Sequence, residues 1–164
     1  MSPLGFIRFF SMARPRIIFA SHEVNSPFHR PLTKFSIKQS IFYLFEQEQK
    51  ACSRLYYVFC SDAYLLELNQ RYLQHDTYTD ILTFDLTTPP APIEAEIYIS
   101  IDRVKENAVR FSVSFADELM RVIFHGALHL CGYRDHTVEE QLTMRKKEDF
   151  YLAYWHQMIP GEKN

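Results

Sequence analysis

The chain has 164 residues, of which 47% are hydrophobic and 23% charged, and its formal net charge is −2. This composition is typical of one globular domain, and the charge excludes a protein that attracts nucleic acid through an overall basic surface. No apolar run is long enough to span a bilayer, and the three cysteines (Cys52, Cys60 and Cys131) form no CxxC pair, so we expect a protein of the reducing cytoplasm without a membrane partner.

The first sixteen residues are basic and contain no acidic residue. Their apolar part is short and is broken by Arg8, which argues against a secretory signal. We therefore expect residues 1–16 to be a poorly ordered extension that precedes a second possible start at Met12. Residues 17–164 are predicted to form a single domain.

Strands and helices alternate along that domain. Branched and aromatic residues predict strands at 16–24, 55–61, 80–86 and 94–100. Apolar residues at helical spacing predict helices at 36–50, 62–73, 102–111, 115–131 and 138–158. This order predicts one α/β (α+β) domain in which a mixed four-stranded sheet packs with about five helices.

Polar residues mark where several of these helices begin. Ser36 is the predicted N-cap of the first helix, Ser114 caps the helix at 115–131, and Thr137 forms a capping box with Glu140 for the last one. The helix at 62–73 is expected to bury Tyr72 together with two leucines.

The stretch HGALHLCGYRDH, residues 125–136, carries the strongest chemical signal. His125 and His129 are four residues apart on the predicted helix, so their side chains are neighbours and can chelate one metal. Gly132 is suited to end the helix and reverse the chain, which brings the next few residues over the pair, where a third ligand would complete the site. Cys131 fits a buried small residue better than a ligand.

Three protein ligands leave one position of a tetrahedral zinc for water, which is the arrangement of a hydrolytic site. In the HExxH motif of metalloproteases a glutamate follows the first histidine and acts as the general base. Gly126 occupies that position here, which argues against proteolysis while leaving water activation by a metal intact.

Three segments together resemble the YbeY-type zinc endoribonucleases, which are bacterial factors of ribosomal RNA maturation. HGALHLCGYRDH is similar to the family's HGxLHLxGYDH, LNQRYLQHDTYTDILTF (68–84) to its LNxxYRxxDxPTDVLSF, and AEIYIS (95–100) to its G-D/E-I-x-I-S strand. The resemblance covers most of the chain, from about residue 17 to residue 155. It implies a metal-dependent hydrolase domain over 17–164, with one zinc ion bound by three residues.

The third ligand differs from the family pattern. The family's third histidine falls six residues after the second, where this chain has Asp135, and His136 follows one residue later. Either Asp135 replaces the histidine, or Arg134 is inserted and His136 is the ligand. We favour Asp135, because a carboxylate is an acceptable zinc ligand and the match then needs no change in loop length. The metal ligands implied are His125, His129 and Asp135, with His136 as the alternative.

A second difference lies in the segment expected to contact RNA. Leu73 stands where the family has an arginine, and Arg71 or His75 are the candidates to replace it, although Arg71 also fits a solvated helix residue. Pro and Gly of the family pattern are replaced by Tyr78 and Ala95. The metal site is therefore better supported by the sequence than the RNA-cleaving activity.

The resemblance implies a zinc-dependent endoribonuclease specific for single-stranded RNA, acting in ribosomal RNA processing and ribosome maturation, with the ribosome or its assembly factors as partners. The metal would activate water or the ribose 2′-hydroxyl. Whichever of Asp135 and His136 is not a ligand is the nearest candidate acid or base, which makes His136 the preferred candidate. Asn69, Thr79 and Asp80 are expected to shape the cleft. Two alternatives are a non-catalytic, metal-stapled ribosome-assembly or RNA-binding module and a metal-dependent hydrolase of another substrate.

Overall fold

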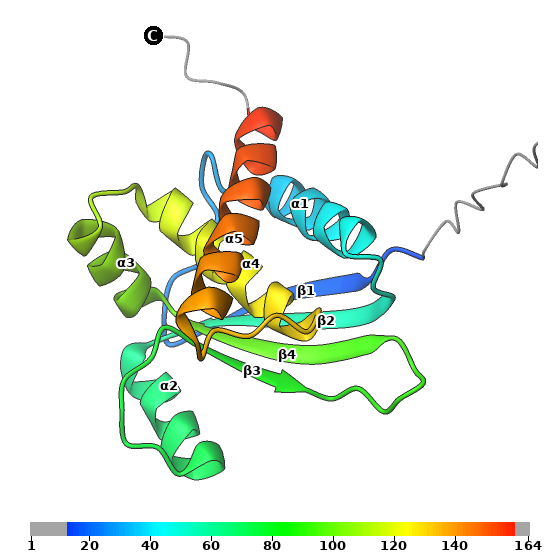
Figure 1. Cartoon of the computed structure of the whole chain (residues 1–164). Coiled ribbons are helices and arrows are strands. Elements are labelled where there is room, and N and C mark those ends of the chain that lie inside the picture. The colour runs from blue at the N-terminus through cyan, green and yellow to red at the C-terminus, as the bar shows by residue number, and fades with distance from the viewer. Residues whose placement is uncertain (1–12, 160–164) are drawn as a thin grey trace, which may run out of the picture.

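Four strands form one mixed sheet in the order β1-β2-β4-β3 in the computed structural model, which describes residues 13–159 (Figure 1). The strands are β1 (Arg16–His22), β2 (Cys52–Cys60), β3 (Ile81–Asp85) and β4 (Ile93–Ser100). β1 and β4 pair in parallel with β2, whereas β3 pairs antiparallel with β4. Residues 1–12 of the expected N-terminal extension lie outside the described residues.

The described residues also form five α-helices and one π-helical turn. They are α1 (Lys34–Gln47), α2 (Asp62–Leu68), the turn η1 (Asn69–Leu73), α3 (Ile101–Arg110), α4 (Phe115–Leu130) and α5 (Val138–Met158). The predicted single α/β domain, with a mixed four-stranded sheet and five helices, is confirmed. None of the described helices is both long and apolar enough to cross a membrane.

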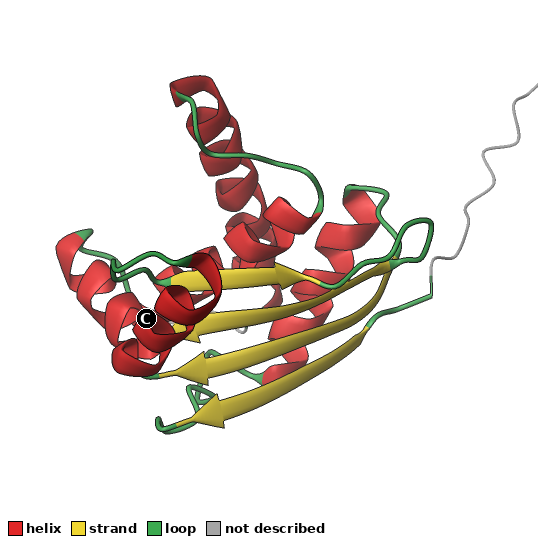
Figure 2. Cartoon of the chain, turned by 90° about the horizontal axis from the view of Figure 1, so that it is seen from below, coloured by secondary structure: helices red, strands yellow, loops and turns green. Residues whose placement is uncertain are grey.

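The two faces of the sheet are covered unequally. Alternation along β3 and β4 sends Ile81 and Ile97 toward the layer of α1, α4 and α5, where they join the main core. Leu82 turns to the other face and packs with Leu65 and Leu68 of α2 in a smaller cluster. The cartoon seen from below shows the twisted four-stranded sheet and the helices around it (Figure 2).

α4 approaches the sheet most closely at Gly126. A Cβ atom at this position would lie 2.7 Å from Cδ1 of Ile81, 3.3 Å from Oγ1 of Thr83 and 3.4 Å from Cγ2 of Ile97. A small residue is therefore required for α4 to lie flat across β3 and β4. This contact fixes how far the helix that carries both histidines stands from the sheet.

The first predicted helix starts earlier than expected. Thr33, rather than Ser36, is the N-cap: its Oγ1 accepts the backbone N–H of Ser36 at 3.1 Å. Ser36 lies inside the first turn, where its hydroxyl donates to the carbonyl of Thr33 at 3.0 Å. A serine can therefore satisfy its polar group within a helix, and the choice between two nearby cap residues depends on the path of the incoming chain. The capping box of Thr137 and Glu140 and the cap at Ser114 are confirmed.

The predicted burial of Tyr72 is wrong, because 61% of its surface is exposed. The helix changes from α to π geometry at Asn69, so residues beyond that point no longer follow the 3.6-residue repeat that predicted burial. The ring of Tyr72 instead meets Phe84 edge-on at 5.8 Å. Leu65 and Leu68, which precede the change, are buried as predicted.

A polar cluster connects three distant segments. Glu48, which follows α1, accepts hydrogen bonds from the Tyr133 hydroxyl at 2.7 Å, from Nζ of Lys147 at 2.8 Å and from the Tyr151 hydroxyl. Burial raises the pKa of Glu48, but the hydrogen bonds from Lys147, Tyr151 and Tyr133 outweigh it, so the pKa lies below its ordinary value of 4.5. The cluster joins the end of α1 to α5 and to the segment that follows α4.

We predict that this cluster makes stability depend on pH. Because the folded-state pKa of Glu48 is lowered, its charge stabilises the fold above the unfolded-state pKa, and this contribution is lost as pH falls through the folded-state value. Wild type should therefore be more stable than Glu48→Gln at pH 7, and the difference should shrink over roughly pH 5 to 3. Urea unfolding of both proteins across this pH range measures the difference in their free energies of unfolding. A difference that does not change with pH would contradict the prediction.

A second prediction concerns the contact at Gly126. Gly126→Val should lower the free energy of unfolding by about 1–3 kcal/mol, because the added atoms overpack the interface with Ile81 and Ile97. Gly126→Ala should cost less, since Cδ1 of Ile81 can rotate away and alanine favours the helix by about 1 kcal/mol. Denaturant unfolding of the two variants tests the order, and equal stabilities would show that α4 can move away from the sheet.

Candidate metal centre

The histidine pair lies on the last two turns of α4, facing the segment that follows the helix and the middle of α5. Nε2 of His125 and Nε2 of His129 are 2.9 Å apart, as the i,i+4 spacing requires when both rings turn to the same side. Both side chains are partly buried, with 24% and 31% of their surfaces exposed, so one side of the pair is open to solvent.

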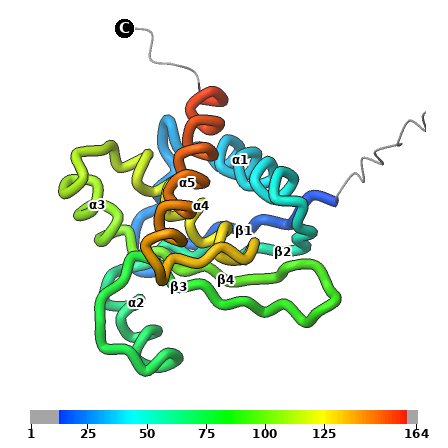
Figure 3. Tube along the Cα trace, in the orientation of Figure 1, coloured from blue at the N-terminus to red at the C-terminus, as the bar shows by residue number. Residues whose placement is uncertain are grey.

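The chain reverses directly after the helix. The backbone N–H of Gly132 donates to the carbonyl of His129 at 3.0 Å, and that of Tyr133 donates to Leu128 at 3.1 Å, which together form a Schellman motif. Gly132 has a φ of 102°, in the left-handed region expected for it. The tube trace shows this segment folding back from α4 before it enters α5 (Figure 3).

The reversal brings a carboxylate to the histidines. Oδ2 of Asp135 lies 3.3 Å from Nε2 of His125 and 3.5 Å from Nε2 of His129. The first turn of α5 fixes the backbone here: Nε2 of Gln141 donates to the Asp135 carbonyl at 3.0 Å, and Glu140 accepts the backbone N–H of His136 at 2.9 Å. Gln141 therefore holds the backbone of the residue that faces the histidine pair, and Glu140 holds that of the next residue.

The other nitrogen of each imidazole is already engaged. Nδ1 of His125 lies 2.7 Å from Oε1 of Glu148, and Nδ1 of His129 lies 2.9 Å from the backbone carbonyl of Tyr133. Both partners only accept hydrogen bonds, so each Nδ1 carries the proton and each Nε2 presents a lone pair. Histidine ligands of metal ions are usually oriented by a partner of this kind on the second nitrogen.

These atoms form a group that can hold a metal ion. One ligand atom from each of His125, His129 and Asp135 lies within 4.8 Å of the other two. Ligands bound about 2 Å from a tetrahedral metal lie about 3.3 Å from one another. The separations of 2.9, 3.3 and 3.5 Å fit that arrangement, and the open side leaves room for a fourth ligand.

Charged neighbours favour a cation at this position. Burial lowers the pKa of His125, but the hydrogen bond and charge of Glu148 outweigh it, so the pKa is raised. Glu148 is itself buried. The guanidinium of Arg121 lies 3.0 Å from Oε2 of Glu148 and 2.8 Å from Oδ1 of Asp149. Arg121 therefore balances the charge of Glu148 on the side away from the imidazole.

Two further acidic side chains lie in the same charged neighbourhood. Burial raises the pKa of Asp80, which the charge of His125 partly offsets. Burial likewise raises the pKa of Glu118, as does the charge of Asp80, while Arg121 and Arg145 lower it. Each carboxyl is thus harder to ionise than usual, and a divalent cation bound nearby would favour its ionised form.

The other residues of the motif lie differently. The side chain of His136 is exposed and is not part of the three-residue group, and its backbone N–H is bound to Glu140. Cys131 is buried, as expected, and burial raises the pKa of its thiol to about 12. A cysteine of this kind is a packing residue.

The segment expected to contact RNA is exposed and lies after α2. Arg71 of η1 is ion-paired with Glu67 of α2 at 2.6 Å, and His75 donates its backbone N–H to the carbonyl of Asn69 at 3.3 Å. Leu73 is 44% exposed. Asn69 is buried and donates from Nδ2 to the carbonyl of Thr77 at 2.8 Å, which holds the segment in place.

Reasoning from the sequence missed the partners of the two histidines. Glu148 lies 23 residues from His125 in the sequence, on a helix whose residue pattern does not single it out. A glutamate three turns into α5, opposite Arg121 of α4, gives no local signal, because the contact exists only once the two helices pack. The carbonyl of Tyr133 gives none either, since every residue has one.

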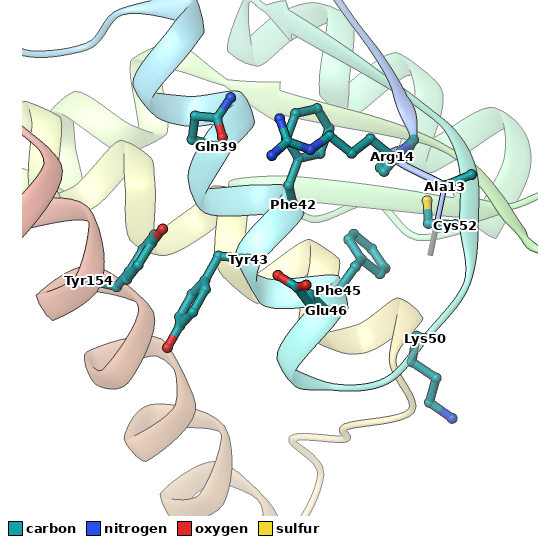
Figure 4. Close-up of a pocket in the computed structure, with 11 residues that line it drawn as sticks. Ala13, Arg14, Gln39, Phe42, Tyr43, Phe45, Glu46, Lys50, Cys52 and Tyr154 are labelled. Carbon is teal, nitrogen blue, oxygen red and sulfur yellow. The ribbon is translucent and has the colours of Figure 1, made fainter. Parts of the chain in front are cut away.

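A separate hollow lies beside the C-terminal half of α1. It has a volume of about 370 Å³ and is lined by Arg14, Phe42, Glu46, Cys52 and Tyr154 among others (Figure 4). The guanidinium of Arg14 lies 5.0 Å from the centre of the Phe42 ring. None of the residues that line this hollow belongs to the group formed by His125, His129 and Asp135.

Known proteins resemble this chain in sequence and in fold. The family model described as Endoribonuclease YbeY matches residues 24–156, which include the whole histidine motif. The chain belongs to the YbeY family. The resemblance stated from the sequence is thereby confirmed.

Curated relatives that carry the name Endoribonuclease YbeY match at about half of the aligned positions. The relative from Flavobacterium psychrophilum is 50% identical over 109 residues, covering 66% of this chain and 77% of the relative. The one from Cytophaga hutchinsonii is 50% identical over 108 residues, covering 66% and 76%. A solution structure of a Thermotoga maritima protein superposes with a TM-score of 0.61 at 25% identity, covering 90% of this chain and 98% of that one.

The left-handed turn generates a prediction. Gly132→Ala should destabilise the fold by about 1 kcal/mol, because the backbone conformation disfavours a side chain although no atom lies within 4 Å of the new Cβ. It should also weaken metal binding by moving Asp135. Thermal unfolding and a zinc titration measure the two effects. An unchanged melting temperature together with unchanged metal affinity would show that the turn tolerates the substitution.

Proposed function

We propose that the protein is a zinc-dependent endoribonuclease that cleaves single-stranded RNA and acts in ribosomal RNA processing and ribosome maturation. One observation carries the proposal: Nε2 of His125, Nε2 of His129 and Oδ2 of Asp135 converge on one solvent-open point, with each imidazole oriented through Nδ1. Relatives that share half of the aligned positions carry the name Endoribonuclease YbeY.

In this proposal His125, His129 and Asp135 bind one Zn²⁺ per chain. Two imidazoles and one carboxylate, with a fourth position open, are a donor set found at hydrolytic zinc sites. Asp135 is preferred to His136 as the third ligand, because its carboxylate faces both Nε2 atoms while His136 stays outside the group. When bound, the metal supplies an acidified water near pKa 7 and positive charge for the phosphodiester.

The chain's own residues would then divide the remaining work. Glu148 and the carbonyl of Tyr133 hold the two imidazoles in the orientation that presents Nε2. His136, exposed beside the group and left free by the assignment of Asp135, is the candidate to move protons during cleavage. Arg71 and His75, on the exposed segment after α2, are the candidates to contact the RNA backbone.

The proposed location is the cytoplasm, with the ribosome or its assembly factors as partners. The three cysteines are free and buried, and burial raises the pKa of each thiol to about 12. Thiols in that state need no oxidising compartment, which supports the proposal.

We expect purified protein to cleave single-stranded RNA and to lose this activity with a chelator, with added zinc restoring it. His125→Ala should be inactive under every condition, because losing one of three ligands breaks the chelate. His156→Ala is the matched control, since His156 is an exposed histidine paired with Asp117 at 2.6 Å, outside the metal group. Electrophoresis of labelled single- and double-stranded RNA of one sequence separates the products.

Two results would overturn the proposed activity. Cleavage that survives both the chelator and His125→Ala would come from a contaminant or from another site. Metal binding without cleavage would instead identify a metal-stapled ribosome-assembly module, a reading favoured by the exposed Leu73 at the position of the family's arginine.

Side-by-side metal titrations of two single variants test the third ligand. Asp135→Ala should bind zinc far more weakly than wild type, because its carboxylate is one of three ligands. His136→Ala should bind zinc nearly as well, and any change should fall on turnover. The reverse pattern would assign His136 to the metal, and equal small losses would place the third ligand elsewhere in the chain.

A further inference from the structure

Glu48 lies 85 residues from Tyr133 in sequence, yet it contacts the turn that brings Asp135 to the histidine pair. Oε2 of Glu48 accepts the hydroxyl of Tyr133 at 2.7 Å, and Tyr133 directly follows the left-handed Gly132. Tyr133 is also the residue whose backbone carbonyl lies 2.9 Å from Nδ1 of His129. Tyr133 thus contacts the proposed ligand His129 through its backbone, and it contacts Glu48 through its side chain.

The carboxylate of Glu48 is itself held firmly. Its other oxygen accepts Nζ of Lys147 at 2.8 Å and the hydroxyl of Tyr151, a residue that is 1% exposed. Nζ of Lys147 lies 5.2 Å from the centre of the Tyr133 ring, so this side chain restrains the ring as well as the carboxylate. The hydroxyl end of Tyr133 is therefore fixed by α5 and by the segment after α1 together.

Fixing the side chain of Tyr133 also restrains its backbone. The turn from Cys131 to Asp135 is short, and Tyr133 stands two residues before Asp135. A rotation of the peptide that carries the Tyr133 carbonyl would misdirect His129 and displace Asp135 at the same time. Two of the three proposed ligands thus depend on where this tyrosine is held.

We propose that Glu48 is a positioning residue for the metal group, acting through Tyr133 on His129 and Asp135. This inference rests on the proposed metal site and adds to it a carboxylate that touches none of the three ligands. Groups that orient a metal ligand typically change metal affinity by 10–100-fold when removed. Glu48 should have an effect within that range.

The test compares metal affinity in matched pairs of variants. Glu48→Gln and Tyr133→Phe each remove part of the contact and keep the shape of the side chain. Glu96→Gln and Tyr98→Phe are the controls, because the hydroxyl of Tyr98 donates to Oε2 of Glu96 at 2.9 Å within β4, in an equivalent pair outside the metal group. Zn²⁺ affinity is measured by competition with a chromogenic chelator, and Co²⁺ absorption reports the geometry of the site.

We expect Glu48→Gln and Tyr133→Phe to weaken Zn²⁺ binding roughly 10-fold or more and to change the Co²⁺ spectrum. The double variant should lose little more than either single variant, because both act through one contact. The control variants should keep the wild-type affinity and spectrum. Circular dichroism of the metal-free variants at the assay temperature establishes that each is folded. A loss of Zn²⁺ affinity in a folded variant then cannot come from unfolding.

Each other outcome overturns the inference in a recognisable way. Wild-type affinity in folded Glu48→Gln and Tyr133→Phe would show that the turn needs no support from Glu48, while the proposed metal site would stand. Equal losses in the Glu96 and Tyr98 controls, or fully additive losses in the double variant, would reduce the effect to general destabilisation. A wild-type protein that binds no metal would overturn the proposed function and this inference together.

Discussion

The reversal of the chain at Gly132 is the constraint on which the metal group depends. A helix can place His125 and His129 side by side, but it cannot bring a third residue of the same segment to their Nε2 atoms. The left-handed conformation at Gly132 turns the backbone within one residue, and the Schellman hydrogen bonds satisfy the last carbonyls of α4. Asp135 then reaches both imidazoles because the first turn of α5 holds its backbone.

Polar contacts from three directions maintain this arrangement. Glu148 reaches His125 from α5, the carbonyl of Tyr133 reaches His129 from the turn, and Glu48 reaches Tyr133 from the end of α1. Carboxylates removed from water are costly unless they are paired, and here Arg121 pairs with the buried Glu148 while Lys147 pairs with the partly buried Glu48. A divalent cation bound by the group would add a charge that favours the ionised form of every carboxyl near it.

The contact between α4 and the sheet explains why the motif is not that of a zinc peptidase. The residue after the first histidine faces Ile81, Thr83 and Ile97, and a Cβ atom there already meets Ile81 at 2.7 Å. A glutamate at this position would bury its carboxylate among apolar side chains of the sheet. Position 126 therefore offers no acid or base to the group formed by His125, His129 and Asp135.

The sequence by itself determined the order of the elements and the spacing that pairs His125 with His129, because these follow from patterns within one segment. The ungapped match to the family motif already favoured Asp135 as the third residue of the group. Helical spacing placed His125 and His129 together, and glycine at 132 marked the turn, since both signals are local. The identity of the first N-cap and the exposure of Tyr72 were predicted wrongly, because the incoming chain at Thr33 and the π-helical turn at Asn69 decide them. Only the tertiary structure brought Glu148 to His125 and Glu48 to Tyr133, since contacts between residues 23 and 85 positions apart exist only after the helices have packed on the sheet.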